Sequence, residues 1–154
     1  MKKSLLIIFG VIIIIFACEK DDFCISNPVT PNLVLRFYDA TDESTTQEVD
    51  SLYIWAEGMD TIHSNHTTDS IAIPLNTLAS STTYILAQGT QKLDTLTLEY
   101  DPEEEYVSRS CGFRIIFNNI VVSADDEVKW IQSATPQNIS SINNQDQAHV
   151  RIFH

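Results

Sequence analysis

Runs of alternating apolar and polar residues recur along this chain from residue 32 onward, and they restrict what it can fold into. In the segment 32–39, the residues Leu33, Leu35 and Phe37 fall on one face of an extended backbone. A period of two residues is typical of a strand with one buried face, whereas an amphipathic helix repeats its apolar residues about every 3.6 positions. No window of useful length has the helical period, so the sequence predicts an all-β fold.

Other segments with strand-like composition are separated by turn residues. Further strands are expected at 51–56, 70–75, 82–87, 93–100, 111–117 and 148–153. The pair 82–87 and 93–100 is predicted to form a hairpin, and the apolar run 111–117 is expected to be a central strand. The segment 61–68 is expected to be a loop or a short edge strand, the acidic segment 101–105 a turn, and 132–147 a long loop.

Short strands at roughly 10 to 15 residue spacing are typical of an antiparallel two-sheet sandwich. We expect an immunoglobulin-like or transthyretin-like arrangement over residues 32–154, with a small β-barrel as the alternative. The side chains expected in its core are Leu33, Leu35, Phe37, Ile54, Ile73, Leu86, Leu98, Phe113, Ile115, Phe117, Val150 and Ile152.

The N-terminal residues have the pattern of a secretion signal. Lys2 and Lys3 precede an apolar run from Leu5 to Phe16, which is shorter than the roughly 20 residues of a spanning helix. The segment 15–18 resembles the lipobox of bacterial lipoproteins, although Phe16 is bulkier than usual there. The resemblance implies that residues 1–17 are removed, that Cys18 is acylated, and that 18–31 is a tether. An ordinary signal peptide or an uncleaved anchor is the alternative.

The residues after Cys18 resemble a surface-export signal. Lys20, Asp21 and Asp22 match the basic residue and two acidic residues that direct Bacteroidota-type lipoproteins to the outer face of the outer membrane. This implies a lipid-anchored, surface-exposed protein. A tether that is merely soluble and charged, on a protein that faces the periplasm, is the alternative.

The charge of the mature chain argues against nucleic acid as a partner. Loss of Lys2 and Lys3 leaves seven basic against twenty-one acidic side chains, a net charge of 7 − 21 = −14. Such a surface repels phosphate backbones and anionic headgroups.

Two cysteines remain once Cys18 is assigned to lipid. Cys24 and Cys111 can then form the one intramolecular disulfide open to the chain, in a compartment that permits oxidation. The alternative is two free thiols, with Cys111 buried in an apolar strand and Cys24 exposed.

Three segments together resemble a known family: Cys18 to Asp22, Leu33 to Asp39, and Ser110 to Phe113. They are similar to an uncharacterised domain-of-unknown-function family of Bacteroidota lipoproteins. The resemblance implies placement at the envelope and brings no activity with it.

Candidate chemistry is sparse. His63 and His66 have an H-x-x-H spacing that suits a metal on a helix, but their surroundings favour solvated histidines in a loop or strand. The acidic segments 101–105 and 125–127 carry oxygen ligands for calcium without the EF-hand spacing, and solvated acidic turns are the simpler interpretation. No nucleophile elbow and no Gly-rich phosphate loop is present, so no cofactor is expected.

Four segments resemble the Asp-Ser/Thr-aliphatic acceptor for O-glycosylation in exported Bacteroidota proteins. The acceptor hydroxyls are those of Ser51, Thr61, Ser70 and Thr95. The same three-residue pattern is also typical of the start of an alternating strand.

These features favour a non-enzymatic lipoprotein that acts as a binding or assembly module at the cell surface, with an envelope protein or a glycan as its partner. One alternative is a small metal-dependent or hydrolytic enzyme that uses His63 and His66. A second is a purely structural component of the envelope.

Overall fold

The computed structural model describes residues 24, 29–90, 92–124, 130–137 and 140–154. These residues form two compact units. One contains Cys24 and Tyr106–Phe113, and the other contains Val29–Glu105 and Arg114–His154. The described part of the chain holds no helix with the length and hydrophobicity that a membrane crossing requires.

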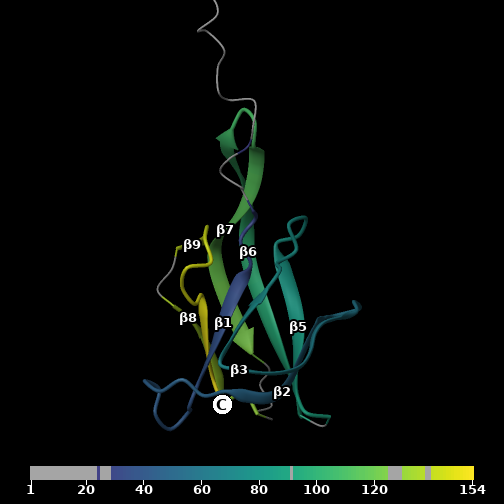
Figure 1. The fold of residues 1–154 in the computed structure, drawn as a ribbon, viewed down its shortest axis with the longest axis vertical. Coiled ribbons are helices and arrows are strands. Elements are labelled where there is room, and N and C mark those ends of the chain that lie inside the picture. Colours follow the sequence, from purple (N-terminus) through teal and green to yellow (C-terminus); the bar gives the residue numbers. More distant parts are fainter. Residues whose placement is uncertain (1–23, 25–28, 91, 125–129, 138–139) are drawn as a thin grey trace, which may run out of the picture. The chain divides into compact units, whose positions relative to one another are not determined.

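The described residues form an all-β sandwich of two sheets (Figure 1), as the alternation predicted. The four-stranded sheet has the order β4-β1-β10-β8. Its strands are β1 Leu33–Tyr38, β4 Ser70–Ile73, β8 Ser133–Pro136 and β10 Val150–Phe153. The six-stranded sheet has the order β3-β2-β5-β6-β7-β9. Its strands are β2 Val49–Ala56, β3 Thr61–Thr68, β5 Ser81–Gln88, β6 Lys92–Ser108, β7 Gly112–Ala124 and β9 Ser141–Ile142.

One strand pair departs from the predicted antiparallel arrangement. β1 and β10 are parallel, with Leu35 opposite Val150 and Phe37 opposite Ile152. Parallel neighbours need a long connection, and here all strands of the six-stranded sheet lie between them in the sequence. β4 and β8 then flank the parallel pair in antiparallel orientation.

The core lies between the inner faces of the two sheets. β1 alternates buried and half-buried residues along its length, and Leu33, Leu35 and Phe37 are fully buried. They share one apolar cluster with Leu52 and Ile54 of β2, in the other sheet. Full burial of such a side chain stabilises the fold by about 1.5–3 kcal/mol, so this cluster is what holds the sheets together.

Irregular positions change which side chains of a strand face the core. Three non-glycine residues within strands have a positive φ: Ser51 at 51°, Asn65 at 56° and Asn119 at 53°. In β7 the buried face changes at Asn119, because Phe117 is buried before it and the even-numbered Ile120 packs against the core after it. An extra residue in a strand produces this shift, and Asn tolerates the left-handed conformation well.

Several sequence-based boundaries are confirmed and others are wrong. The hairpin is present as β5 and β6, with Thr83 opposite Thr97, and 61–68 is the edge strand β3. The expected acidic turn 101–105 lies inside β6, because side chains of β7 donate hydrogen bonds to its carboxylates. The expected loop 132–147 contains β8 and β9.

Two expectations for the run 111–117 are also wrong. β7 is not central, because it has only the two-residue strand β9 beyond it. Phe113 is 61% exposed although it shares the alternation of Phe117. Phe113 belongs to the smaller unit, whose described residues include no second sheet that could cover its ring.

Candidate functional site

An open cavity of about 740 Å³ lies in the larger unit, at the ends of β2, β4 and β5. Residues from the segments 56–62, 74–76 and 81–84 line it. The turn after β2 is closed by a hydrogen bond from the Met59 amide to the Ala56 carbonyl at 3.0 Å. Gly58 within this turn has a φ of 74°, which glycine adopts without strain. The turn leaves Met59 at the rim of the cavity.

The rim combines apolar and acidic groups. Met59 is 71% exposed and Ile62 is 37% exposed, which is unusual for side chains of this size. Glu57 and Asp60 line the same cavity and are exposed. The arrangement offers an apolar contact surface with negative charge beside it.

Two tyrosines hold the connection between β4 and β5 beneath the cavity. The Tyr84 hydroxyl donates a hydrogen bond to the Pro74 carbonyl, and the Tyr100 hydroxyl donates to the Asn76 carbonyl at 2.9 Å. The Thr82 hydroxyl bonds to the Tyr100 hydroxyl and accepts from the Asn76 amide at 3.1 Å. These hydroxyls are therefore engaged in holding the cavity wall.

Burial sets the protonation state of both phenols. It raises the pKa of Tyr84, and the neighbouring Tyr100 phenol raises it further. Burial is also the main cause that raises the pKa of Tyr100, and the hydrogen bonds of its hydroxyl with Thr82 and with the Asn76 backbone oppose this effect. Both hydroxyls stay protonated at neutral pH and serve as hydrogen-bond donors.

The predicted histidine pair does come together, on β3. The ring centroids of His63 and His66 are 5.3 Å apart. Residues three apart lie on opposite faces of a regular strand. Here Leu52 pairs with His66 and Ile54 with His63, so β3 has one extra residue, and the positive φ of Asn65 marks it.

Among the described residues, the side-chain hydrogen bond of this pair outside β3 is with the backbone of β4. One ring nitrogen of His63 lies 3.2 Å from the Ala72 carbonyl, which ties β3 to β4. No group of three His, Cys, Asp or Glu side chains with metal-binding geometry occurs among the described residues. The geometry assigns His63 a role in joining the two strands.

Three acidic side chains of β6 pair with side chains of the neighbouring strand β7. Asp101 accepts a hydrogen bond from Asn119, and Glu103 accepts one from Asn118, each at 2.7 Å. Glu105 forms an ion pair with Arg114 at 2.5 Å. The second predicted calcium segment, 125–127, lies outside the described residues.

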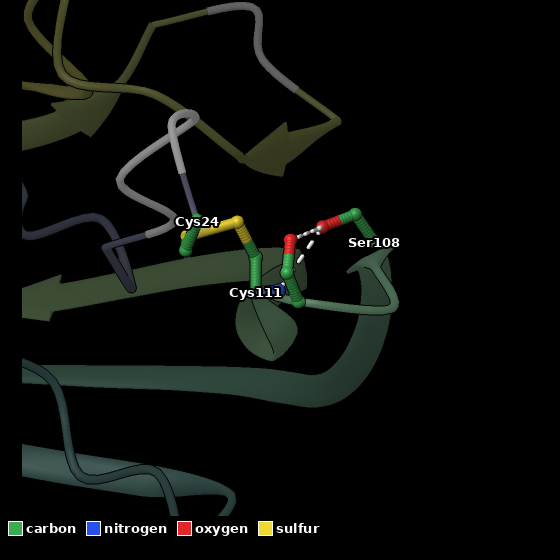
Figure 2. The surroundings of a disulfide bond; sticks show 4 residues. Cys24, Ser108 and Cys111 are labelled. Atoms are coloured by element: carbon green, nitrogen blue, oxygen red, sulfur yellow. Dashed lines mark hydrogen bonds between the residues drawn. A yellow bond between two sulfur atoms is a disulfide. The ribbon is translucent and has the colours of Figure 1, made fainter. Parts of the chain in front are cut away.

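Cys24 and Cys111 form a disulfide, which confirms the predicted pairing (Figure 2). Cys111 lies in the turn between β6 and β7, not in a buried strand as expected. Its amide donates to the Ser108 hydroxyl at 3.0 Å, which closes the turn. The bond joins positions that are 87 residues apart and ties the chain near its predicted tether to the tip of this hairpin.

The predicted lipidation site Cys18, the export residues Lys20, Asp21 and Asp22, and the signal segment 1–17 lie outside the described residues.

The four predicted glycosylation acceptors differ in accessibility. Thr61 is exposed at the start of the edge strand β3. Ser51 is half-buried at a bulge of β2, and Thr95 is half-buried in β6, opposite Ile85 of β5. The Ser70 hydroxyl donates to the Leu35 carbonyl at 3.2 Å. Of the four hydroxyls, that of Thr61 is the most accessible to an enzyme.

Two buried polar side chains were missed by the sequence interpretation. Asp94, which is 2% exposed, accepts hydrogen bonds from the amides of Trp130 and Ile131 at 2.8 and 3.0 Å. His149, which is also 2% exposed, accepts one from the Val34 amide at 2.9 Å. Asp94 carried a usable signal, because its carboxylate precedes a stretch of alternating Thr and Leu residues, 95–98, in which no other charge occurs. Its place in a predicted glycosylation motif obscured this structural role.

Comparison with known proteins gives one match. A family model described as a family of unknown function (DUF6452) matches residues 51–154. No curated protein and no solved structure matches the chain.

Proposed function

Because the chain belongs to this family of unknown function, DUF6452, we propose its function from its own residues: it is a lipid-anchored envelope protein whose β sandwich binds a partner. The binding site is the cavity beside Met59. The proposed role is binding, and the hydroxyls of Thr82, Tyr84 and Tyr100 support the wall of the site through their hydrogen bonds.

The observation that carries the proposal is the exposed apolar rim. Met59 and Ile62 stand at the mouth of a cavity of about 740 Å³, a volume in the range of small-ligand and peptide pockets. Exposed apolar groups that converge on a concave surface mark interaction sites more often than scattered single residues do.

The same lining indicates the chemistry of the partner. Stacking on a sugar requires an exposed aromatic face, and Tyr84, the aromatic residue of the lining, is 1% exposed. Apolar anchors fit between Met59 and Ile62, and cationic groups pair with Glu57 and Asp60. We therefore favour an envelope protein segment with apolar and basic side chains over a glycan.

Placement at the surface of the outer membrane is part of the proposal. It is supported by the lipobox-like segment that ends at Cys18 and by the Lys20, Asp21 and Asp22 signal. Protease treatment of intact cells should degrade the protein, and alanine at these three signal residues should protect it. Equal degradation of both proteins would refute the export role.

Binding at the cavity is tested by photocrosslinking in cells that make the lipidated protein. A benzophenone amino acid in place of Met59 should give one discrete protein adduct. The matched control carries the same group at Leu93, which is 44% exposed and does not line the cavity. In a separate affinity purification without the photoprobe, Met59→Glu should recover less of the adduct partner than the unsubstituted protein, and its melting temperature should not be lower. Adducts of equal pattern from both positions would reject the cavity as the site.

A further inference from the structure

The tip of the β6–β7 hairpin exposes two aromatic rings. Tyr106 is 60% exposed and Phe113 is 61% exposed, and they are the most exposed aromatic side chains in the described part of the chain. Their ring centroids are 5.4 Å apart, one at the end of each strand. Aromatic rings bury large apolar areas when they find a partner, so this exposed pair offers an apolar contact surface.

The disulfide fixes how far this surface can lie from the proposed lipid. Cys18 precedes Cys24 by six residues. An extended chain spans at most about 3.5 Å per residue, so the backbone of Cys24 lies within roughly 20 Å of the acylated cysteine. Cys111 is bonded to Cys24 (Figure 2) and lies in the turn between the two strands that carry the aromatic pair. The hairpin tip cannot move away from the membrane beyond the length of this short link.

The charge of the tip also differs from that of the chain. The full sequence carries a net charge of −12, and an acidic surface is repelled by anionic headgroups. The segment Tyr106–Phe113 contains no acidic residue and has one basic residue, Arg109. This segment therefore carries no acidic group that an anionic membrane surface would repel.

We infer that the hairpin tip is a membrane-contacting surface, in which Tyr106 and Phe113 insert into the headgroup region of the bilayer that holds the acyl chains of Cys18. The inference rests on the lipid anchor of the proposed function. Aromatic side chains favour this interfacial region, where an apolar ring and a polar hydroxyl are both accommodated. The protein would then contact the membrane at two places, through the acyl chains and through the hairpin tip. The disulfide links these two places to each other.

The test uses the full lipidated protein, purified from its own membranes and placed in vesicles of phosphatidylethanolamine and phosphatidylglycerol. In one set of vesicles the acyl chains carry bromine close to the headgroup, which quenches tryptophan emission on contact. The probe variant is Phe113→Trp, and the matched control is Leu78→Trp, which replaces a side chain that is 96% exposed in the larger unit. Emission of the unsubstituted protein, from Trp55 and Trp130, is subtracted from both.

Emission from the tryptophan at position 113 should be quenched by the brominated lipid and shifted to shorter wavelength, whereas that at position 78 should not change. Replacing both Cys24 and Cys111 by Ser in the Phe113→Trp protein should reduce the quenching, because the link between tip and anchor is lost. Intact mass, measured on each preparation, shows whether Cys18 is acylated. With acylation present, equal quenching at both positions would overturn the inference and leave the anchor standing. A mass without acyl chains would overturn both.

Discussion

Val34 and His149 exchange two hydrogen bonds at the point where the parallel pair of β1 and β10 begins. The His149 amide donates to the Val34 carbonyl at 2.8 Å, and the Val34 amide donates to Nδ1 of His149 at 2.9 Å. The imidazole therefore takes the place of a ladder carbonyl. It does so only when Nδ1 carries no proton.

Stability should fall in mildly acidic solution because of this imidazole. Burial lowers the pKa of His149 below its ordinary value of 6.5, against a smaller opposite effect from the hydrogen bond to the Asn144 backbone. As pH falls through 6.5 the unfolded chain binds a proton that the folded chain does not, so the free energy of unfolding decreases until the folded pKa is passed. Above about pH 7.5 this contribution is complete and constant.

Urea unfolding between about pH 7.5 and pH 5 measures the effect. His149→Gln retains an oxygen acceptor that does not titrate and should remove most of the slope in this range. Asp39 and Asp42 do not contribute to the slope in this pH range. Hydrogen bonds from hydroxyl groups lower the pKa of each carboxyl group below 3.8, so the stability that these groups contribute is lost only at more acidic pH. An unchanged slope in His149→Gln would rule out the imidazole as its cause.

Asp94→Ala should be among the more destabilising changes in the sandwich. It removes the acceptor of two buried amides, those of Trp130 and Ile131, and each unsatisfied buried group costs about 1–3 kcal/mol. We expect a loss of about 2–4 kcal/mol in the free energy of unfolding. Chemical denaturation gives the value.

Asp94→Asn provides the conservative comparison. Both amides donate to the same oxygen, Oδ2, so one amide oxygen can accept from both and the loss should be smaller. The exposed Asp50 begins a similar sequence motif, and Asp50→Ala should cost less than about 0.5 kcal/mol. Similar losses at positions 94 and 50 would contradict the structural role of the buried carboxylate.

Replacing Cys24 and Cys111 by Ser should lower stability through the unfolded state. The disulfide closes a loop of 87 residues, and the loop-entropy model gives about 4 kcal/mol for a loop of this length. The oxidised protein should therefore unfold at a higher urea midpoint than the variant with Ser at both positions. Equal midpoints, with the disulfide verified by mass, would show that it does not stabilise the fold.

Thr61 should carry sugar in the natively expressed protein, if any of the four acceptor motifs does. Its hydroxyl lies on an exposed edge strand, whereas the Ser70 hydroxyl is bonded to the Leu35 carbonyl. Intact mass should fall by more than the side-chain difference in Thr61→Ala. In Ser70→Ala it should fall by the side-chain difference alone, and the opposite result would show that exposure does not select the site.

The sequence was sufficient for those features that depend on local alternation. The burial of Leu33, Leu35 and Phe37 follows from a period of two, and so does the β5–β6 hairpin. The sequence was insufficient to predict features that depend on contacts between distant segments, such as strand pairing and the burial of individual side chains. The parallel pairing of β1 with β10 has no local pattern, and Phe113 has the alternation of a core residue but no described sheet to cover it.

The cavity was missed for a related reason. Its lining comes from three segments that each read as turns or strand ends, and only the folded chain brings Met59 near Tyr84. The histidine pair shows the opposite case, because the H-x-x-H spacing was visible but its meaning depended on a bulge at Asn65. Bulges add one residue without a clear compositional signal, so the face on which a side chain lies could not be read from spacing.

The adjacency of β1 and β10 has a consequence for how the chain matures. Leu35 and Val150 are neighbours in the sheet but are made 115 positions apart. During synthesis β1 would emerge early and remain, with an unpaired edge and an exposed apolar face, until β10 had been made. A molecule interrupted before residue 150 would keep that edge open to proteases and to other chains. Pairing of β10 with β1 is thus a late step in folding, and it closes the edge of β1 that stays exposed in an incomplete chain.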